Sequence, residues 1–531
     1  MGVLSTLIFL PLAGALLILL LPDRLARAAR TVALVIAGVQ LLLAGWLYMQ
    51  FQTGASFAGV AKESQYQFVE KAGWITLDLG QNSRLLIDYF VGIDGISLGL
   101  VVLSTLVIFI ALLASGEIKE RLKGYFALFL LMDMAIIGVF CALDFFLFYL
   151  FYELMLLPLY FLIGMWGGAR REYASIKFFL YTLFGSVFML LVMIGLYFSS
   201  YDVGTGQHTF NMVKLMDPGA YSSDGLFSPL VAQTLFGLPA RAVGFFVLFL
   251  AFAIKVPVVP VHTWLPDAHV EAPTPVSIVL AGILLKVGGY GIIRIVFGIF
   301  PDVAGNWAFW IGLLGAVSIL YGALNALAQT DLKRLIAYSS VSHMGFVLLG
   351  FASQTPEGLS GAMLQMISHG VLSSMLFFIT GVIYTRVHDR EIYHFRGLAA
   401  LMPRYTTFVL IAFFASLGLP GFSAFIAEAF TLIGAFSSQS VNGLLPHWMA
   451  IAGSLGILLS AGYLLWTLQR MFFGPLRLKG EDWKEKLRDL DVTEKIILTA
   501  LSLLAVLLGV MPSLYFNTVN DAVLALIHHL S

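Results

Sequence analysis

The sequence predicts an all-α, polytopic membrane protein with about 14 transmembrane helices. Of its 531 residues, 60% are hydrophobic and only 11% are charged, whereas a soluble domain carries roughly 25% charged residues. The mean hydropathy is +0.92, and a spanning helix needs only about 20 mostly apolar residues. The 30 basic and 30 acidic residues cancel. No net positive charge therefore draws a polyanion to the chain, and we expect no nucleic-acid partner.

Hydropathy divides the chain into fourteen apolar segments, each long enough to cross a membrane. Their expected limits are 3–21, 31–50, 90–114, 124–141, 143–165, 176–198, 241–260, 275–297, 306–328, 335–352, 359–384, 405–436, 447–472 and 494–512.

The basic residues predict the orientation. Loops after odd-numbered segments hold 21 of the 30 Lys and Arg, whereas loops after even-numbered segments hold five: Lys62, Lys71, Arg84, Lys214 and Arg241. The positive-inside rule places the odd-numbered loops in the cytoplasm. Both termini then lie on the outer, periplasmic side, as an even number of spans requires. A miscount by one span would erase this asymmetry between odd-numbered and even-numbered loops, so the asymmetry supports a count of fourteen spans.

Two segments are interrupted by helix-breaking residues. Segment seven contains Pro257 and Pro260, and segment twelve contains Gly418, Pro420 and Gly421. Proline removes a backbone donor, and in lipid the freed backbone groups survive only where protein or a water-filled cavity satisfies them. Interrupted spans at corresponding positions indicate a transporter built from inverted repeats.

The interruptions are five segments apart, which predicts two five-helix repeats, segments 4–8 and 9–13. Because five is odd, the second repeat is inverted relative to the first. We expect N-terminal spans at 1–123, the first repeat at 124–297, the second at 306–472, and a cytoplasmic loop with the final span at 473–531. Coincidence is the alternative, since Pro and Gly are frequent in membrane helices.

Six ionisable side chains fall inside predicted spans, where a charge costs about 2.5–3.5 kcal/mol. In chain order they are Glu153, Lys255, Lys286, His343, His369 and Glu428. Residues this costly are usually functional and paired. The order of acid, two lysines, two histidines and acid suits proton relay, because a buried lysine responds to the charge of its neighbour and histidine titrates near neutral pH.

Each of the six has a structural alternative. Glu153 and Lys255 would form a buried pair with no further role, and Lys286 would extend its ammonium toward the membrane surface. His343 and His369 would be hydrogen-bonded packing residues, and Glu428 would only satisfy the broken helix.

Other polar residues receive structural interpretations. Asp133 and Asp144 lie near the ends of predicted spans and are interpreted as interfacial, and Asp94 is interpreted as structural. The single cysteine, Cys141, cannot supply the four ligands of an iron–sulfur cluster.

Further charged and imidazole side chains follow segment seven, in an expected loop. They are His262, Asp267, His269 and Glu271, and their spacing does not match a zinc motif. We therefore predict no metal site there.

Three stretches carry a family resemblance: Phe-Tyr-Glu-Leu-Met-Leu-Leu-Pro (151–158), Lys-Val-Pro-Val-Val-Pro-Val-His-Thr-Trp-Leu-Pro-Asp-Ala-His (255–269) and Asp-Leu-Lys-Arg-Leu-Ile-Ala-Tyr-Ser-Ser-Val-Ser-His-Met-Gly (331–345). They resemble the antiporter-like membrane subunits of proton-pumping NADH:quinone oxidoreductase, respiratory complex I, and the resemblance covers essentially the whole chain. Glu428 stands where the chain-M (mitochondrial chain 4) type carries Glu and its two paralogues carry Lys. The short stretch after the final span also differs from the chain-L type, which has a long lateral helix.

The resemblance implies a role for each of the six residues. Glu153 and Lys255 would be the coupling pair, Lys286 the central relay, His343 and His369 its extension, and Glu428 the distal exit group. The sequence matches the family pattern at all six positions.

The resemblance also implies the activity and the partners. The chain would move protons across a bacterial cytoplasmic membrane, driven by NADH oxidation and quinone reduction in other subunits. We expect no cofactor in this chain, with flavin mononucleotide, iron–sulfur clusters and quinone bound elsewhere in the complex. The expected partners are lipids and the other membrane-arm subunits, including the two paralogous antiporter-like chains.

Other functions share some of these features. A subunit of a multisubunit cation/proton antiporter or of a membrane-bound hydrogenase has the same core. A small-solute transporter would need varied polar ligands near the interruptions, where His262, Thr263 and Ser423 are the candidates. A purely structural scaffold would not need six central ionisable groups.

Overall fold

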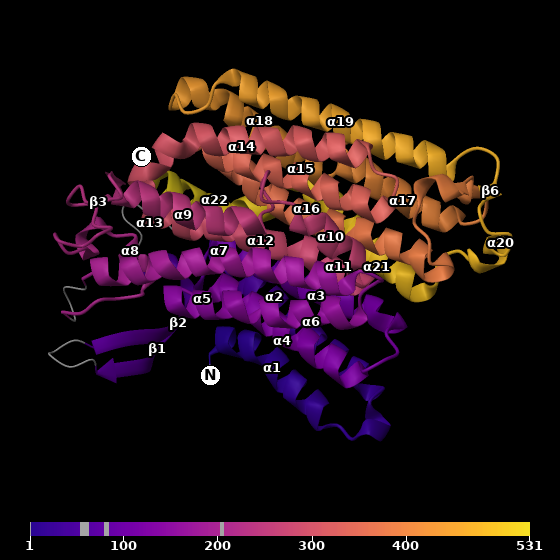
Figure 1. Cartoon of the computed structure of the whole chain (residues 1–531), viewed down its shortest axis with the longest axis horizontal. Coiled ribbons are helices and arrows are strands. Elements are labelled where there is room, and N and C mark those ends of the chain that lie inside the picture. Colours follow the sequence, from indigo (N-terminus) through magenta and orange to yellow (C-terminus); the bar gives the residue numbers. More distant parts are fainter. Residues whose placement is uncertain (1, 54–62, 79–83, 202–205) are drawn as a thin grey trace.

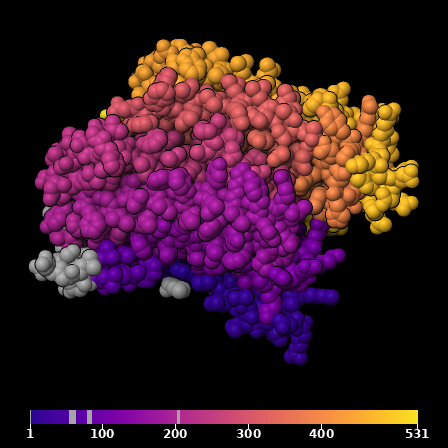
Figure 2. Space-filling view, viewed as in Figure 1, coloured from indigo at the N-terminus to yellow at the C-terminus, as the bar shows by residue number. Residues whose placement is uncertain are grey.

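The structure is a computed structural model that describes residues 2–53, 63–78, 84–201 and 206–531. Most of these residues lie in long helices that run along the longest axis of the molecule (Figure 1). The N-terminal segment, in indigo, projects below the main body in Figure 2. Lys62, one of the basic residues used for the predicted orientation, lies outside the described residues.

Within the described residues, thirteen helices are long and apolar enough to cross a membrane. A fourteenth crossing consists of two shorter halves, α9 and α10, which agrees with the predicted number. The crossings are α1 (Val3–Leu20), α2 (Ala28–Gln50), α3 (Gly95–Ala114), α4 (Leu122–Cys141), α5 with α6 (Phe145–Leu154, Leu156–Trp166), α7 (Arg171–Ser199), α9 with α10 (Ala240–Lys255, Trp264–Glu271), α11 to α13 (from Thr274–Val279 to Phe297–Ile299), α14 (Pro301–Leu327), α15 (Leu332–Ser353), α16 (Pro356–Val387), α17 with α18 (Pro403–Ser416, Ser423–Val441), α19 (His447–Phe472) and α21 (Val492–Val510).

The centre of the bundle consists of the α11–α13 unit, α15 and α16, in which nearly every residue is buried. Helices α1, α2, α7 and α19 instead expose large apolar side chains, as helices in contact with lipid do. Three of the six predicted site residues lie on the central helices, where they are shielded from lipid on all sides.

Helices α14 and α15 approach each other closely through glycine. A Cβ added at Gly345 would lie 2.7 Å from the carbonyl oxygen of Gly315, and one added at Gly322 would lie 2.6 Å from the backbone nitrogen of Ser342. Small residues let membrane helices pack backbone to backbone. The hydroxyl of Ser342 also donates to the carbonyl of Ile319, at 2.8 Å. These contacts fix α15, which carries His343.

The first predicted interruption is confirmed between α9 and α10. Helix α9 ends at Lys255, and the backbone groups released there find partners. The indole N–H of Trp264 donates to the carbonyl of Ile254 at 2.8 Å, and the backbone N–H of Val259 donates to the hydroxyl of Ser318 at 3.2 Å. The break therefore persists inside the bundle without unsatisfied backbone groups at these positions.

The second predicted interruption is confirmed between α17 and α18. Gly418 and Gly421 adopt φ angles of +78° and +101°, which favour glycine. A Cβ at Gly418 would also lie 2.8 Å from Oε2 of Glu428. Glycine at this position therefore both allows the turn and leaves room for the carboxylate of the following helix.

The two broken helices occupy corresponding places in chain order. The α9–α10 pair is the fourth crossing of the 124–297 region, and the α17–α18 pair is the fourth crossing of the 306–472 region. The limits of the two repeats and of the terminal regions stay predictions.

Two parts of the described chain differ from the expected spans. Residues 90–93 belong to a strand, and α3 begins only at Gly95, because β1 (Gln67–Asp78) and β2 (Arg84–Ile93) form an antiparallel hairpin. The apolar residues of β2 extend the hydropathy signal beyond the helix. A further helix, α22 (Ser513–Leu530), follows α21 and packs against α3 and α16.

The remaining short elements lie at the two ends of the bundle (Figure 1). They are α8 (Met212–Leu215), β3 (Thr234–Leu235), β4 (Leu238–Pro239), β5 (Phe395–Arg396), β6 (Arg477–Leu478) and α20 (Trp483–Lys486). We call the end that carries β5, β6 and α20 the basic end, because it holds the loops with most of the Lys and Arg.

Candidate functional site

Glu153 and Lys255 lie at the ends of two helices, α5 and α9. The ammonium of Lys255 is fully buried, has no hydrogen-bond partner among the described residues, and lies 3.5 Å from the ring centroid of Tyr152. Glu153 is the charged side chain that interacts electrostatically with Lys255, although no direct ion pair joins the two among the described residues. The carboxyl of Glu153 lies beside Ser186 of α7. The expected pair therefore interacts through space, and an aromatic ring supports the cation.

Lys286 lies on α12 (Leu285–Gly291), a short regular stretch between two π-helical turns, η5 (Leu280–Leu284) and η6 (Ile292–Val296). Such wide turns are rare and frequently mark functional sites. The fully buried ammonium donates to the carbonyl of Ala281, at 2.5 Å, and lies 2.7 Å from Nδ1 of His369. The ammonium is therefore held at the bundle centre and does not extend to the membrane surface.

His369, His343 and Glu428 continue from Lys286 across three helices, α16, α15 and α18. The imidazole rings of His369 and His343 have centroids 5.7 Å apart, and Nδ1 of His343 lies 3.3 Å from Oε1 of Glu428. The amide of Gln365 also lies 3.4 Å from that Nδ1. Four of the six predicted residues thus form one contiguous row.

A small polar cavity adjoins this row. Its lining includes His343, His369, Gln365 and several serines, and it has room for on the order of one water molecule. One of these serines, Ser368, hydrogen-bonds across to Ser423 at the start of α18, at 2.7 Å. The gap between the two imidazole rings is therefore polar and can hold a bridging water.

The two groups of residues are connected by tight helix packing. A Cβ added at Gly288, two residues after Lys286, would lie 2.8 Å from the backbone nitrogen of Val256, the residue after Lys255. The end of α9 and the middle of α12 therefore lie in direct backbone contact.

Two buried basic residues near the site were not predicted. His269 is fully buried, stacks on Phe377 with ring centroids 4.4 Å apart, and interacts electrostatically with both Lys333 and Lys286. The ammonium of Lys333 donates to the carbonyl of Ala272, at 2.6 Å. Both residues were assigned to loops: α10 was not predicted as a helix, and Lys333 stands in a charged stretch.

Lys333 also borders a large open cavity at the basic end. This cavity has a volume of about 2090 Å³ with its open mouth, and charged side chains such as Glu271 and Asp331 line it. It reaches from the surface to the buried side chain of Lys333.

The remaining polar residues after segment seven have separate partners. The ring of His262 packs against Tyr321, and Asp267 pairs with Lys177 at 2.7 Å and with Arg334 at 3.3 Å. In the part of the chain that the structure describes, no three His, Cys, Asp or Glu side chains are grouped closely enough to hold a metal ion.

The interfacial interpretation of Asp133 was wrong. Asp133 lies in the middle of α4 and is fully buried, with Gln40 of α2 as its polar neighbour. The predicted span, 124–141, already has this residue near its middle, so only the assignment of the side chain to the membrane surface was wrong, and packing of α2 on α4 buries it. Asp144 does lie at a helix end, where it caps α5 by accepting from the N–H of Leu147, but it is buried.

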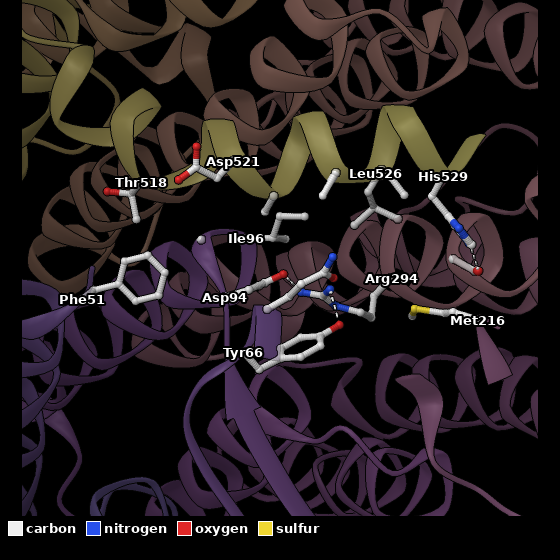
Figure 3. A pocket seen from close by; sticks show the side chains of 16 residues that line it. Phe51, Tyr66, Asp94, Ile96, Met216, Arg294, Thr518, Asp521, Leu526 and His529 are labelled. Atoms are coloured by element: carbon white, nitrogen blue, oxygen red, sulfur yellow. Dashed lines mark hydrogen bonds and ion pairs between the residues drawn. The ribbon is translucent and has the colours of Figure 1, made fainter. Parts of the chain in front are cut away.

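Asp94 has the structural role that the sequence suggested. It caps α3 and forms a buried ion pair with Arg294, at 2.6 Å, while Arg294 also donates to the hydroxyl of Tyr66 (Figure 3). Burial alone would raise the pKa of the Asp94 carboxyl. The charge and hydrogen bond of the facing Arg294 guanidinium lower it by more, so the pKa lies below its ordinary value. Helix α22 covers the adjoining cavity of about 700 Å³.

Comparison with known proteins identifies the family. A family model described as the transmembrane part of NADH:quinone oxidoreductase and Mrp antiporters matches residues 142–460. NADH-quinone oxidoreductase subunit M of Rickettsia bellii is 38% identical over 528 residues, which cover 98% of this chain and 97% of that protein. The subunit M of Rhodobacter capsulatus is 39% identical over 535 residues, with 99% and 97% covered.

A solved structure shows the same arrangement. One chain of respiratory complex I from Thermus thermophilus with bound NADH is 29% identical and superposes with a TM-score of 0.81, covering 99% of this chain and 100% of that chain. The chain belongs to the antiporter-like membrane subunits of NADH:quinone oxidoreductase, respiratory complex I, and within them to the subunit M (chain 4) type.

Proposed function

We propose that this chain translocates protons across a bacterial cytoplasmic membrane as a membrane-arm subunit of NADH:quinone oxidoreductase. The observation that carries the proposal is the contiguous row Lys286, His369, His343 and Glu428 in the fully buried centre of the bundle. Ionisable groups inside a membrane protein are expensive, and a row of them that faces the bundle interior is typical of a proton relay.

In this proposal the redox chemistry takes place in other subunits. This chain binds no cofactor of its own, and flavin, iron–sulfur clusters and quinone belong to its partners, which include two paralogous antiporter-like chains. The basic end faces the cytoplasm and both termini lie on the periplasmic side, as the distribution of Lys and Arg indicates.

The Glu153–Lys255 pair acts as the switch. A charge change in a neighbouring subunit alters the field at Glu153. Lys255 responds, because its ammonium has no hydrogen-bond partner among the described residues and interacts with the ring of Tyr152 and the charge of Glu153. Close packing of α9 on α12 passes this response to Lys286. Such groups titrate as a coupled set, so the proton count belongs to the row and not to one residue.

The cavity at the basic end serves as the inlet. Protons reach Lys286 by way of Lys333 and His269 and leave it through Nδ1 of His369. The proton then crosses the polar gap to His343 and passes to Glu428, from which it exits on the opposite side. Moving one proton across the whole membrane against a potential of 100 mV requires roughly 2.3 kcal/mol.

The test is proton pumping by the assembled complex in proteoliposomes, measured with a pH-sensitive dye against NADH oxidation. Glu153→Ala and Lys286→Ala should abolish or strongly reduce the protons moved per NADH while the complex still assembles. Lys484→Ala, which removes an exposed lysine at the basic end, is the control and should pump normally. Normal pumping by both site variants would refute the proposal.

A second candidate is a subunit of a multisubunit cation/proton antiporter or of a membrane-bound hydrogenase. The observation in its favour is that the matching family model covers both NADH:quinone oxidoreductase and Mrp antiporters. Co-purification decides between them: flavin and iron–sulfur subunits that oxidise NADH support the first proposal, and their absence supports the second.

A further inference from the structure

An open groove lies at the basic end, beside the last turns of α19. It is formed by the β5–β6 pair and the short turn η7 (Ile392–His394), and it has a volume of about 1200 Å³ with its mouth. Four basic side chains line it: Arg396, Arg470, Arg477 and Lys479. Three of them lie within residues 470–479, and the pairing of β5 with β6 brings Arg396 to the same place.

None of these four cations has an acidic partner among the described residues. The ion pairs nearby involve other side chains: His394 with Asp389, and Lys486 with Asp482. Arg386, at the same end but outside the groove, does have an acidic partner, Glu494, at 2.8 Å. The groove therefore presents an uncompensated positive charge, which favours an anionic ligand.

Arg470 is held in place by aromatic rings. Its guanidinium lies 3.4 Å from the ring centroid of Trp466 and 4.7 Å from that of Tyr393. Its Nη1 is buried without a hydrogen-bond partner in the part of the chain that the structure describes. A stacked guanidinium with an unused donor is prepared to bind a phosphate or a carboxylate.

The groove continues into an apolar surface on the same helix. Helix α19 exposes a stripe of large apolar side chains that recur every three to four residues, or after seven, and therefore share one face: Trp448, Ile451, Leu455, Leu458 and Leu465. The helix rises about 33 Å from Trp448 to Arg470, close to the thickness of a hydrocarbon core. The stripe therefore spans the membrane interior and ends at the cationic groove.

We propose that the groove binds the phosphate headgroup of an anionic phospholipid whose acyl chains lie along the exposed face of α19. Basic clusters with Trp and Tyr at the end of a membrane helix are suited to such headgroups. The apolar stripe favours a lipid over an acidic protein segment, because one molecule then satisfies both the cations and the hydrocarbon-facing surface. Phosphatidylcholine lacks the net negative charge that the groove requires.

The experiment uses the assembled complex in nanodiscs that contain either phosphatidylcholine alone or phosphatidylcholine with photo-crosslinkable phosphatidylglycerol. The variant carries Arg470→Gln, Arg477→Gln and Lys479→Gln. The control carries Arg404→Gln, Lys484→Gln and Arg488→Gln, which removes the same charge from exposed positions at the same end but outside the groove. Assembly is checked by size-exclusion chromatography and NADH oxidation.

We expect phosphatidylglycerol to crosslink to residues near the groove in the unaltered complex. The yield at this position should fall at least fivefold in the groove variant and stay within twofold in the control. Addition of inorganic phosphate should not compete at millimolar concentration, since it lacks acyl chains.

Three outcomes would overturn the proposal. They are an unchanged yield in the groove variant, full competition by inorganic phosphate, and no crosslinking of phosphatidylglycerol near the groove in the unaltered complex. Proton pumping by the same variants is measured in proteoliposomes. Loss of lipid binding with retained pumping leaves the proposed function intact, so the two proposals can fail separately.

Discussion

The ammonium of Lys286 and Nδ1 of His369 lie 2.7 Å apart across two buried helices. When Lys286 is charged it donates to this nitrogen, so the neutral imidazole carries its proton on Nε2. Nε2 has no hydrogen-bond partner among the described residues. The contact therefore fixes the tautomer of His369 and leaves the proton on Nε2, the nitrogen that faces away from Lys286.

Replacement of His369 should interrupt the row. His369→Phe keeps a ring but leaves Lys286 with the carbonyl of Ala281 alone, so proton pumping should fall at least tenfold while NADH oxidation by detergent-solubilised complex continues. His369→Gln can still accept from the ammonium but cannot exchange a proton at this site, so it should also pump poorly. Normal pumping by both variants would show that the proton bypasses this residue.

The ring of Tyr152 should matter for Lys255 more than its hydroxyl. Tyr152→Phe keeps the ring 3.5 Å from the ammonium, and pumping should stay within twofold of the unaltered complex. Tyr152→Leu removes a cation–π contact worth roughly 2 kcal/mol in a desolvated site. Pumping should then fall markedly, and its pH dependence should change because Lys255 loses its charge more readily. Equal behaviour of the two variants would contradict this account.

Gly288 should not tolerate a larger residue. A Cβ there meets the backbone nitrogen of Val256 at 2.8 Å, so Gly288→Ala should separate α9 from α12 and destabilise the protein by about 1–3 kcal/mol. Gly462, on the exposed side of α19, has no atom within 4 Å of an added Cβ. Gly462→Ala should therefore be neutral or slightly stabilising. Thermal unfolding of the two variants in detergent measures the difference.

Asp133 should carry a proton and behave as a neutral group. Both of its oxygens are buried without a hydrogen-bond partner among the described residues, and Gln40 is its polar neighbour. An unpaired carboxylate in such surroundings would be too costly. Asp133→Asn should retain assembly and pumping, whereas Asp133→Leu leaves the Gln40 amide without this partner and should lower stability. The infrared carbonyl band of a protonated carboxyl should disappear in Asp133→Asn. If the band persists, it belongs to another carboxyl group, and the prediction for Asp133 is wrong.

The Asp94–Arg294 pair should stabilise the protein over the whole physiological pH range. Asp94→Asn keeps a good helix cap but leaves a buried guanidinium unpaired, a penalty of about 3–5 kcal/mol. Because the pKa of Asp94 is lowered in the folded protein, its contribution is present above the ordinary aspartate range and is lost only as the pH falls through the lowered value.

The loss of stability in Asp94→Asn should therefore be the same at pH 5 and pH 8, within the precision of thermal unfolding. Both pH values lie about one unit or more above the pKa of an ordinary aspartate. Asp491→Asn is the matched control, since Asp491 caps α21 in the same way but is exposed and makes no ion pair in the described residues. A comparable loss of stability in the control would mean that helix capping, and not the ion pair with Arg294, causes the effect.

The sequence predicted the features that depend on local signals. Pro257, Pro260 and the glycines at 418 and 421 mark the two broken helices, because each alters the backbone whatever its surroundings. The six ionisable residues are also local signals, since a charge in an apolar run is conspicuous. The contact between Lys286 and His369 joins residues 83 apart in sequence, so it could not be predicted from hydropathy.

Features that depend on tertiary packing were missed. His269 and Lys333 stand in polar stretches that resemble loops, and only the packing of α10 and α15 buries them. The amphipathic helix α22 is too polar for a span by hydropathy. Asp133 was misplaced because its burial comes from α2, which lies far away in the chain.

The wide turns on either side of Lys286 each accommodate one surplus residue. A shift of the seven residues between them by one position would therefore leave the outer ends of the helix in place. One such step rotates a side chain by about 100° around the helix axis. A rotation of that size would carry the ammonium away from the carbonyl of Ala281 and from Nδ1 of His369, its two neighbours in this structure.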